Sequence, residues 1–185
     1  MKPAVSLAVI AAVVLLQGCA AVEYYAQAIG GHLDLVRRAV AIEERLREPD
    51  LAPPLRMKLQ RVVVIRDFAS RELALPDNGS YRRYADLERP FVVWNVFAAP
   101  EFSTRPVESC FPFAGCVAYR GWYDETDARR HADGLKAQGY DVYVGGVPAY
   151  STLGWFDDPL LNTFMAYPDA EVARLVFHEL AHQVA

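Results

Sequence analysis

The spacing of apolar residues predicts a helix at the start of the chain. After position 21, apolar side chains recur every three or four residues, as on one face of a helix that packs on a core: Val22, Tyr25, Ile29, Leu33, Val36 and Val40. We expect this helix to continue to about Glu48, where Pro49 ends it. The pair Gly30–Gly31 inside it indicates close packing or a kink.

A second helix is predicted from Leu55 to about Leu75, after Pro53 and Pro54. Its outer face carries cationic side chains: Arg56, Lys58, Arg61, Arg66 and Arg71. Such a run is typical of a helix face exposed to water, and attraction to a membrane surface is the alternative.

The middle of the chain has the shorter apolar runs that are typical of strands. Phe91–Phe97 and Cys116–Tyr119 are predicted as strands, and a third strand begins with Asp141–Val144. Between the second and third strands, residues 124–138 have a helical pattern, with Gly139 at its end.

The stretch from Gly145 to Phe156 combines glycines, a proline and aromatic side chains. A proline does not fit a central strand, so we predict an edge strand beside a cleft, to which a peptide substrate could add as a further strand. The candidate substrate contacts are Gly146, Tyr150 and Trp155. An ordinary hairpin or loop with core aromatics is the alternative.

The last predicted helix starts at Pro168, with Asp169 as its N-cap. Its apolar residues cover nearly the whole circumference, so we expect a buried helix: Val172, Ala173, Leu175, Val176, Phe177 and Leu180. Together, these patterns predict an α+β fold with long N-terminal helices, a small mixed sheet and this helix at the C-terminus.

This helix contains the pentad His178-Glu179-Leu180-Ala181-His182. Residues four apart on a helix share one face, so the imidazoles of His178 and His182 can converge on one metal ion, for which zinc is the natural choice. Zinc lowers the pKa of a bound water molecule to about 7. Glu179 is then placed to act as general base in the hydrolysis of a peptide bond. The alternative is a surface helix with two histidines that have no such role.

A zinc site of this kind needs a third protein ligand, and only Gln183, Val184 and Ala185 follow the pentad. The other histidines, His32 and His131, lie in polar helical segments where we expect them to be exposed. The chain therefore either borrows a ligand or is incomplete, and we expect the domain to be incomplete after residue 185. We expect weak metal binding and little activity in these 185 residues alone.

The N-terminus has the pattern of a secretory signal. Lys2 precedes an apolar stretch from Ala4 to Leu16, which is too short to span a bilayer comfortably. The end of this stretch resembles the lipobox of bacterial lipoproteins, which implies that residues 1–18 are a signal peptide and that Cys19 carries the lipid. Ala20 implies the outer membrane, with the protein facing the periplasm. An uncleaved apolar anchor is the alternative.

The remaining cysteines, Cys110 and Cys116, would lie in an oxidising compartment, so we expect a disulfide between them. Two free buried thiols are the alternative. The chain of 185 residues is 53% hydrophobic and carries a net charge of -4, as is typical of one globular unit, residues 19–185. The net negative charge argues against a nucleic-acid partner.

Several segments resemble the aminopeptidase family of Gram-negative bacterial lipoproteins: Tyr24–Ala28, Cys110–Gly121, Tyr143–Pro159 and the pentad. The resemblance covers nearly all of the chain after Cys19. It implies a single zincin-like domain, with His178 and His182 as zinc ligands, Glu179 as catalytic base and a third ligand supplied by a following helix.

Two functions are consistent with the sequence. The first is a zinc metallopeptidase, specifically an aminopeptidase, which is anchored to the membrane by lipid and hydrolyses peptides. The second is a non-catalytic lipoprotein of the cell envelope, which uses the edge from Gly145 to Phe156 to bind a partner or stabilise an assembly. The oligomeric state and the natural peptide do not follow from the sequence.

Overall fold

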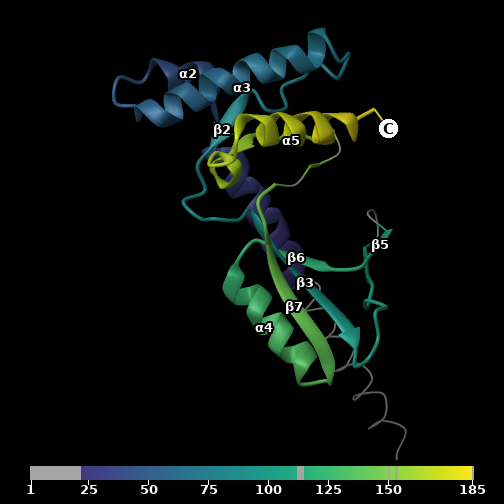
Figure 1. The fold of residues 1–185 in the computed structure, drawn as a ribbon. Helices are drawn as coiled ribbons and strands as arrows, with labels where there is room; N and C mark the ends of the chain where they lie inside the picture. The colour runs from purple at the N-terminus through teal and green to yellow at the C-terminus, as the bar shows by residue number, and fades with distance from the viewer. Residues whose placement is uncertain (1–21, 112–114, 150, 153, 185) are drawn as a thin grey trace, which may run out of the picture.

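The structure is a computed structural model, which describes residues 22–111, 115–149, 151–152 and 154–184. The chain forms two lobes joined by the first helix (Figure 1). The upper lobe in Figure 1 contains α2, α3, α5 and the sheet β1-β2-β8. The lower lobe contains α4 and the sheet β6-β3-β7. The fold is α+β, as the sequence predicts, and its buried apolar residues form two clusters, one in each lobe.

The first helix covers residues 22–38 and does not continue to Glu48. It ends because residues 40 and 41 form β1 (Val40–Ala41), which pairs with β2 (Arg83–Ala85) before the short helix α2 (Ile42–Arg47) begins. Strands of two or three residues are too short to show the alternation of apolar and polar residues by which a strand is recognised.

The predicted core face of this helix is largely wrong. Its first members, Val22, Tyr25, Ile29 and Leu33, are 40% to 69% exposed. The buried side chains are instead Tyr24 and Leu35, which lie on another face of the helix. An amphipathic pattern identifies a stripe of apolar residues but does not say whether the rest of the protein covers it.

The expectation of close packing at the glycine pair is confirmed at Gly31. A Cβ built there would lie 2.1 Å from the Cγ atom of Tyr123, whereas at Gly30 it would meet nothing within 4 Å. The ring of Tyr123 therefore lies directly against the backbone of the first helix, which only a glycine permits at this position.

The upper lobe is built on α3 (Pro53–Arg71), whose apolar face points into the main core through Leu59, Val62 and Ala69. Its sheet is mixed, as predicted, because β2 pairs antiparallel with β1 and parallel with β8 (Leu160–Leu161). The 3-10 helix η1 (Asn162–Phe164) leads from β8 towards α5 (Asp169–Ala181), which packs against α3.

The lower lobe has β3 (Val93–Pro100) at the centre of an antiparallel sheet, between β6 (Arg120–Trp122) and β7 (Tyr140–Val147). Helix α4 (Glu125–Lys136) covers one face, where Ala128 and Ala132 pack with Trp94 and Val96. Asp124 caps α4 by accepting hydrogen bonds from the amides of Thr126 and Asp127.

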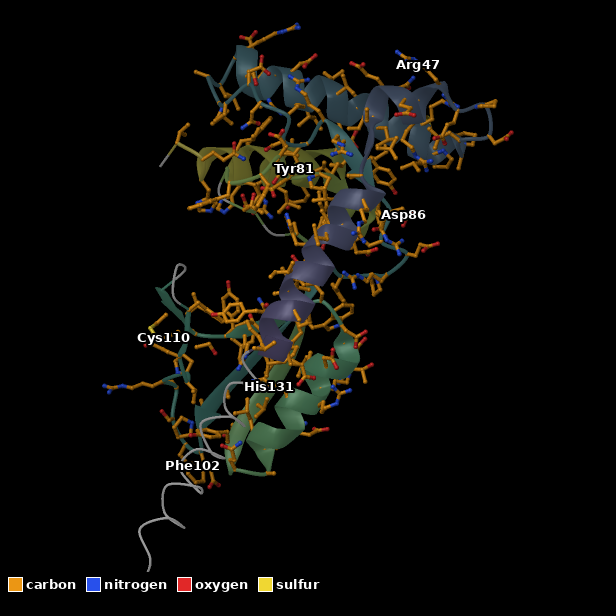
Figure 2. The ribbon with its side chains drawn as sticks, turned by 180° about the vertical axis from the view of Figure 1, so that it is seen from behind. Arg47, Tyr81, Asp86, Phe102, Cys110 and His131 are labelled. Atoms are coloured by element: carbon orange, nitrogen blue, oxygen red, sulfur yellow. A yellow bond between two sulfur atoms is a disulfide. The ribbon has the colours of Figure 1, made fainter. Side chains whose placement is uncertain are left out.

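The predicted strand at Cys116–Tyr119 is displaced. Residues 115–117 form β5 (Gly115–Val117), which pairs with β4 (Ser109–Phe111) in a separate hairpin, and β6 begins only at Arg120. Cys110 and Cys116 are opposite each other in this hairpin and form the expected disulfide. Figure 2 labels Cys110, at the left of the lower lobe in that view.

Candidate metal centre

Helix α5 begins as predicted, but Asp169 is not its N-cap. Pro168 occupies the N-cap position without a side-chain hydrogen bond. The carboxylate of Asp169 instead binds Lys58 at 2.7 Å and Arg61 at 3.2 Å, both from α3. These contacts, with the Lys58 hydrogen bond as the main cause, lower the pKa of Asp169 and tie the start of α5 to α3.

The expectation that α5 is buried on all sides is wrong. Its buried residues are Val172, Val176 and Leu180, which are four apart and form one stripe against the core. The pentad histidines lie on the exposed side of the helix, and Glu179 is half-buried between these two faces. One side of α5 is therefore open to a ligand.

The two histidines of the pentad converge. The Nε2 atoms of His178 and His182 are 3.1 Å apart, and their rings are nearly perpendicular at 87°. Two imidazole nitrogens bound to one tetrahedral zinc ion would be about 3.3 Å apart, given bonds of about 2.05 Å. The pair therefore fits two positions of a zinc shell.

The described residues bring no third protein ligand to this pair. The group of three metal-binding side chains found among them is Glu108, Cys110 and Cys116, on the β4–β5 hairpin. Its two cysteines are joined in the disulfide, so they offer no thiolate to a metal ion.

The remaining histidines are not exposed as expected, because each is half-buried against an aromatic ring. His32 lies 4.8 Å from Phe156, and His131 lies 5.3 Å from Trp122, measured between ring centroids. Burial, and secondarily Arg120, lower the pKa of His131, so its imidazole is neutral at pH 7.

A residue that the sequence does not single out, Tyr81, lies against α5 (Figure 2) and is close enough to Glu179 to be affected by its charge. Its side chain is buried, and its hydroxyl has no hydrogen-bond partner among the described residues. Burial raises the pKa of Tyr81 far above its usual value, and the carboxylates of Asp158 and Glu179 raise it further. The phenol is therefore a neutral donor next to the proposed base.

The backbone of Tyr81 is also unusual, because its φ of 63° lies in the left-handed region that bulky residues rarely adopt. Its amide donates a hydrogen bond of 2.6 Å to the carbonyl of Asp158. No sequence pattern identifies such a position, because neither a strained backbone nor a contact across the fold produces a repeating pattern of apolar and polar residues.

A buried arginine holds the turn that carries Tyr81. Arg66 was predicted on a water-exposed face, but it is 1% exposed. Its guanidinium donates to the carbonyls of Ser80 at 2.8 Å, Pro76 at 2.7 Å and Asn78 at 3.1 Å. Burial lowers the pKa of Arg66, but several acceptors compensate its charge.

The same turn is tied to the end of α5 through Gln183. The amide of Asn78 donates to Oε1 of Gln183 at 2.7 Å, and Nε2 of Gln183 donates to Oγ of Ser80 at 3.2 Å. The turn from Pro76 to Tyr81 is thus fixed from one side by α3 and from the other by the residue after the pentad.

The loop after β7 lies at the same end of α5. The buried carboxylate of Asp158 organises it by accepting hydrogen bonds from the amide and the hydroxyl of Thr152, at 2.9 and 2.8 Å. Gly154, at the loop's tip, faces the side chain of Gln183. Trp155 follows it and is 83% exposed, so its ring is open to solvent.

The other two candidate substrate contacts are Gly146 and Tyr150. Gly146 lies within the edge strand β7, opposite Trp94, and the ring of Phe91 covers it so closely that a Cβ would lie 2.2 Å away. The absence of a side chain at this position therefore leaves room for the ring of Phe91. Tyr150 lies outside the described residues.

Comparison with known proteins finds a matching family. The family model described as "Putative aminopeptidase" matches residues 23–185, which include both lobes and the complete pentad. No curated protein and no solved structure matches the chain. Because the match extends over most of the sequence, the chain belongs to this aminopeptidase family.

Proposed function

We propose that this protein is a zinc-dependent peptidase in which His178 and His182 hold the metal ion and Glu179 is the general base. The observation that carries the proposal is the 3.1 Å separation of the two Nε2 atoms on the open side of α5. A bound zinc ion supplies Lewis-acid chemistry, in that it acidifies water and polarises a peptide carbonyl. The family match also supports a peptidase role.

Glu179 follows His178 directly and is half-buried at the border between the core stripe and the exposed face. In the proposed reaction its carboxylate accepts the proton of the attacking water molecule and passes it to the nitrogen of the leaving group. Tyr81, which lies beside it, remains a neutral phenol that can donate a hydrogen bond. Trp155 offers an exposed aromatic surface to the substrate.

The place of action is part of the proposal. Cys19 would carry the lipid that anchors the protein at the outer membrane facing the periplasm, and this residue lies outside the described residues. Within the part of the chain that the structure describes, no helix is long and apolar enough to cross a bilayer. We propose an aminopeptidase specificity on the basis of the family alone.

The experiment is to compare peptide hydrolysis by the protein from its native membrane with that of two variants. Glu179→Gln should keep zinc but lose about 10² to 10⁴ in kcat/KM, because the base is removed and the ligands remain. Glu171→Gln is the matched control: the same change on the same helix, at an exposed side chain that pairs with Arg174. It should leave kcat/KM unchanged.

Specificity is tested with the same peptides carrying a free or an acetylated amino terminus. An aminopeptidase cleaves the free form and not the acetylated one. Equal cleavage of both forms would contradict the aminopeptidase assignment while leaving the peptidase intact. Zinc-independent hydrolysis, or undiminished activity in Glu179→Gln, would contradict the mechanism, and a complete lack of hydrolysis would favour the non-catalytic envelope module.

A further inference from the structure

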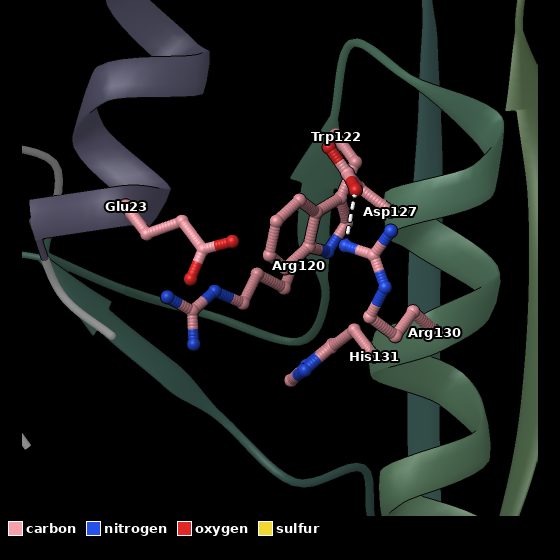
Figure 3. A pocket seen from close by; sticks show the side chains of 6 residues that line it. All are labelled: Glu23, Arg120, Trp122, Asp127, Arg130 and His131. Carbon is pink, nitrogen blue, oxygen red and sulfur yellow. Dashed lines mark hydrogen bonds and ion pairs between the residues drawn. The ribbon is translucent and has the colours of Figure 1, made fainter. Parts of the chain in front are cut away.

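A small pocket of about 200 Å³ lies in the lower lobe, apart from the pentad in the upper lobe. It is formed between the first helix, strand β6 and helix α4 (Figure 3). Six residues line it: Glu23, Arg120, Trp122, Asp127, Arg130 and His131. The first helix supplies one wall, and α4 supplies the opposite one.

The pocket contains hydrogen-bond donors that lack acceptors. Nε of Arg120 and Nε1 of Trp122 are buried and have no hydrogen-bond partner among the described residues. Both atoms carry only a donor hydrogen. Burying such a group without a partner is unfavourable, so a ligand that completes these bonds must bring acceptor oxygens.

The charged side chains that line the pocket are two guanidiniums and two carboxylates, so their formal charges cancel and the attraction for an anion depends on Arg120. The carboxylate of Asp127 is paired with Arg130 at 2.5 Å, and Figure 3 shows this pair turned towards each other beside Trp122. The guanidinium of Arg120 makes no ion pair with a carboxylate of the described residues, but lies 3.9 Å over the ring of Tyr24. Aromatic contacts thus hold Arg120 without neutralising it.

We propose that this pocket binds a phosphate group through Arg120 and Trp122. A phosphate presents acceptor oxygens in several directions, which suits donors that come from separate side chains, whereas a carboxylate presents its two oxygens in one plane. The neutral imidazole of His131 adds one further donor from α4. Glu23 is the opposing feature, since its exposed carboxylate faces Arg120 across the pocket.

The phosphate has two possible sources: a lipid headgroup or phosphate free in solution. Glu23 is four residues after Cys19, a span that an extended chain covers in at most about 14 Å. A protein anchored through Cys19 would therefore hold this pocket near the headgroups. The assignment of the phosphate to a lipid headgroup rests on the proposed anchoring through Cys19. Phosphate binding itself depends on neither the anchor nor the peptidase activity.

The test uses the mature full chain with Cys19→Ser, so that no lipid anchor contributes. Binding of inorganic phosphate is measured by calorimetry, and binding to vesicles of phosphatidylglycerol and phosphatidylethanolamine is measured by sedimentation. Arg120→Met should weaken binding at least about tenfold, and Trp122→Phe, which keeps the ring but removes the N–H, should weaken it several-fold. Glu23→Gln should strengthen it.

The control is Arg129→Gln, which removes the same charge from an exposed side chain of α4 outside the pocket and should bind as the parent does. Arg120-dependent binding to vesicles but not to free phosphate would assign the lipid source, and the reverse would assign the free one. Lack of binding to both, or equal binding by Arg120→Met and the parent, would overturn the proposal. Neither result bears on hydrolysis at the pentad.

Discussion

Replacing the buried arginine of α3 by methionine should destabilise the protein strongly. Arg66→Met keeps much of the side-chain volume but removes the bonds to Ser80, Pro76 and Asn78 and a fourth bond of 2.5 Å to Oγ of Ser70. Each bond from a charged donor contributes about 1.5 kcal/mol, and release of the buried cation offsets part of the sum. We expect a net loss of about 3 kcal/mol.

For a chain of this length, 3 kcal/mol corresponds to a fall in melting temperature of about 6 to 12 °C. Thermal unfolding followed by circular dichroism measures it. The matched control is Arg71→Met on the same helix, where the side chain is 77% exposed and its nearest carboxylate, on Asp67, is 3.9 Å away. The control should change the stability by less than about 0.5 kcal/mol. Equal melting temperatures for the two variants would refute the assignment of Arg66 as the support of this turn.

Three further changes test other parts of the structure. Tyr81→Phe removes a buried hydroxyl that lacks a partner, so urea unfolding should show equal or greater stability, by up to about 2 kcal/mol, and a clear loss would reveal a missed hydrogen bond. Gly31→Ala should cost about 2 kcal/mol because its methyl group would overlap the aromatic ring that covers it, while Gly30→Ala should be neutral or stabilising; similar values for both would contradict the close contact. Lys58→Met removes the main cause of the lowered pKa of Asp169, whose usual value is 3.8. A carboxyl with a lowered pKa stabilises the fold above its unfolded pKa and ceases to do so as the pH falls through its folded pKa. The stability difference between wild type and Lys58→Met should therefore be constant above about pH 5 and shrink below pH 3.8, to a remainder from the bond that Lys58 also donates to the carbonyl of Tyr167. A difference that does not shrink at all in acid would exclude Asp169 as a contributor.

The parts of the structure that the sequence predicts are those with a local cause. The pentad pair converges because residues four apart share a helix face, and the disulfide forms across a short hairpin. The glycine pair signals a close contact because only glycine leaves that space. In each case, residues near each other in sequence determine the geometry.

The parts that the sequence does not predict depend on what lies across the fold. Arg66 belongs to a run of cationic residues that predicts an exposed helix face. Its burial becomes favourable because three carbonyls of the turn from Pro76 to Tyr81 accept its hydrogen bonds. Tyr81 becomes part of the site only because this turn brings it beside Glu179. The apolar stripe that includes Val22 and Ile29 was assigned to the core, since periodicity alone cannot tell a covered face from an open one.

The central claim is that His178 and His182 together hold a zinc ion. The direct measurement is the zinc content of the protein purified from its native membrane, compared with that of a variant carrying His178→Gln and His182→Gln. We predict about one zinc ion per chain in the wild type and almost none in the variant. A wild-type protein without zinc, or a variant that retains it, would contradict the account.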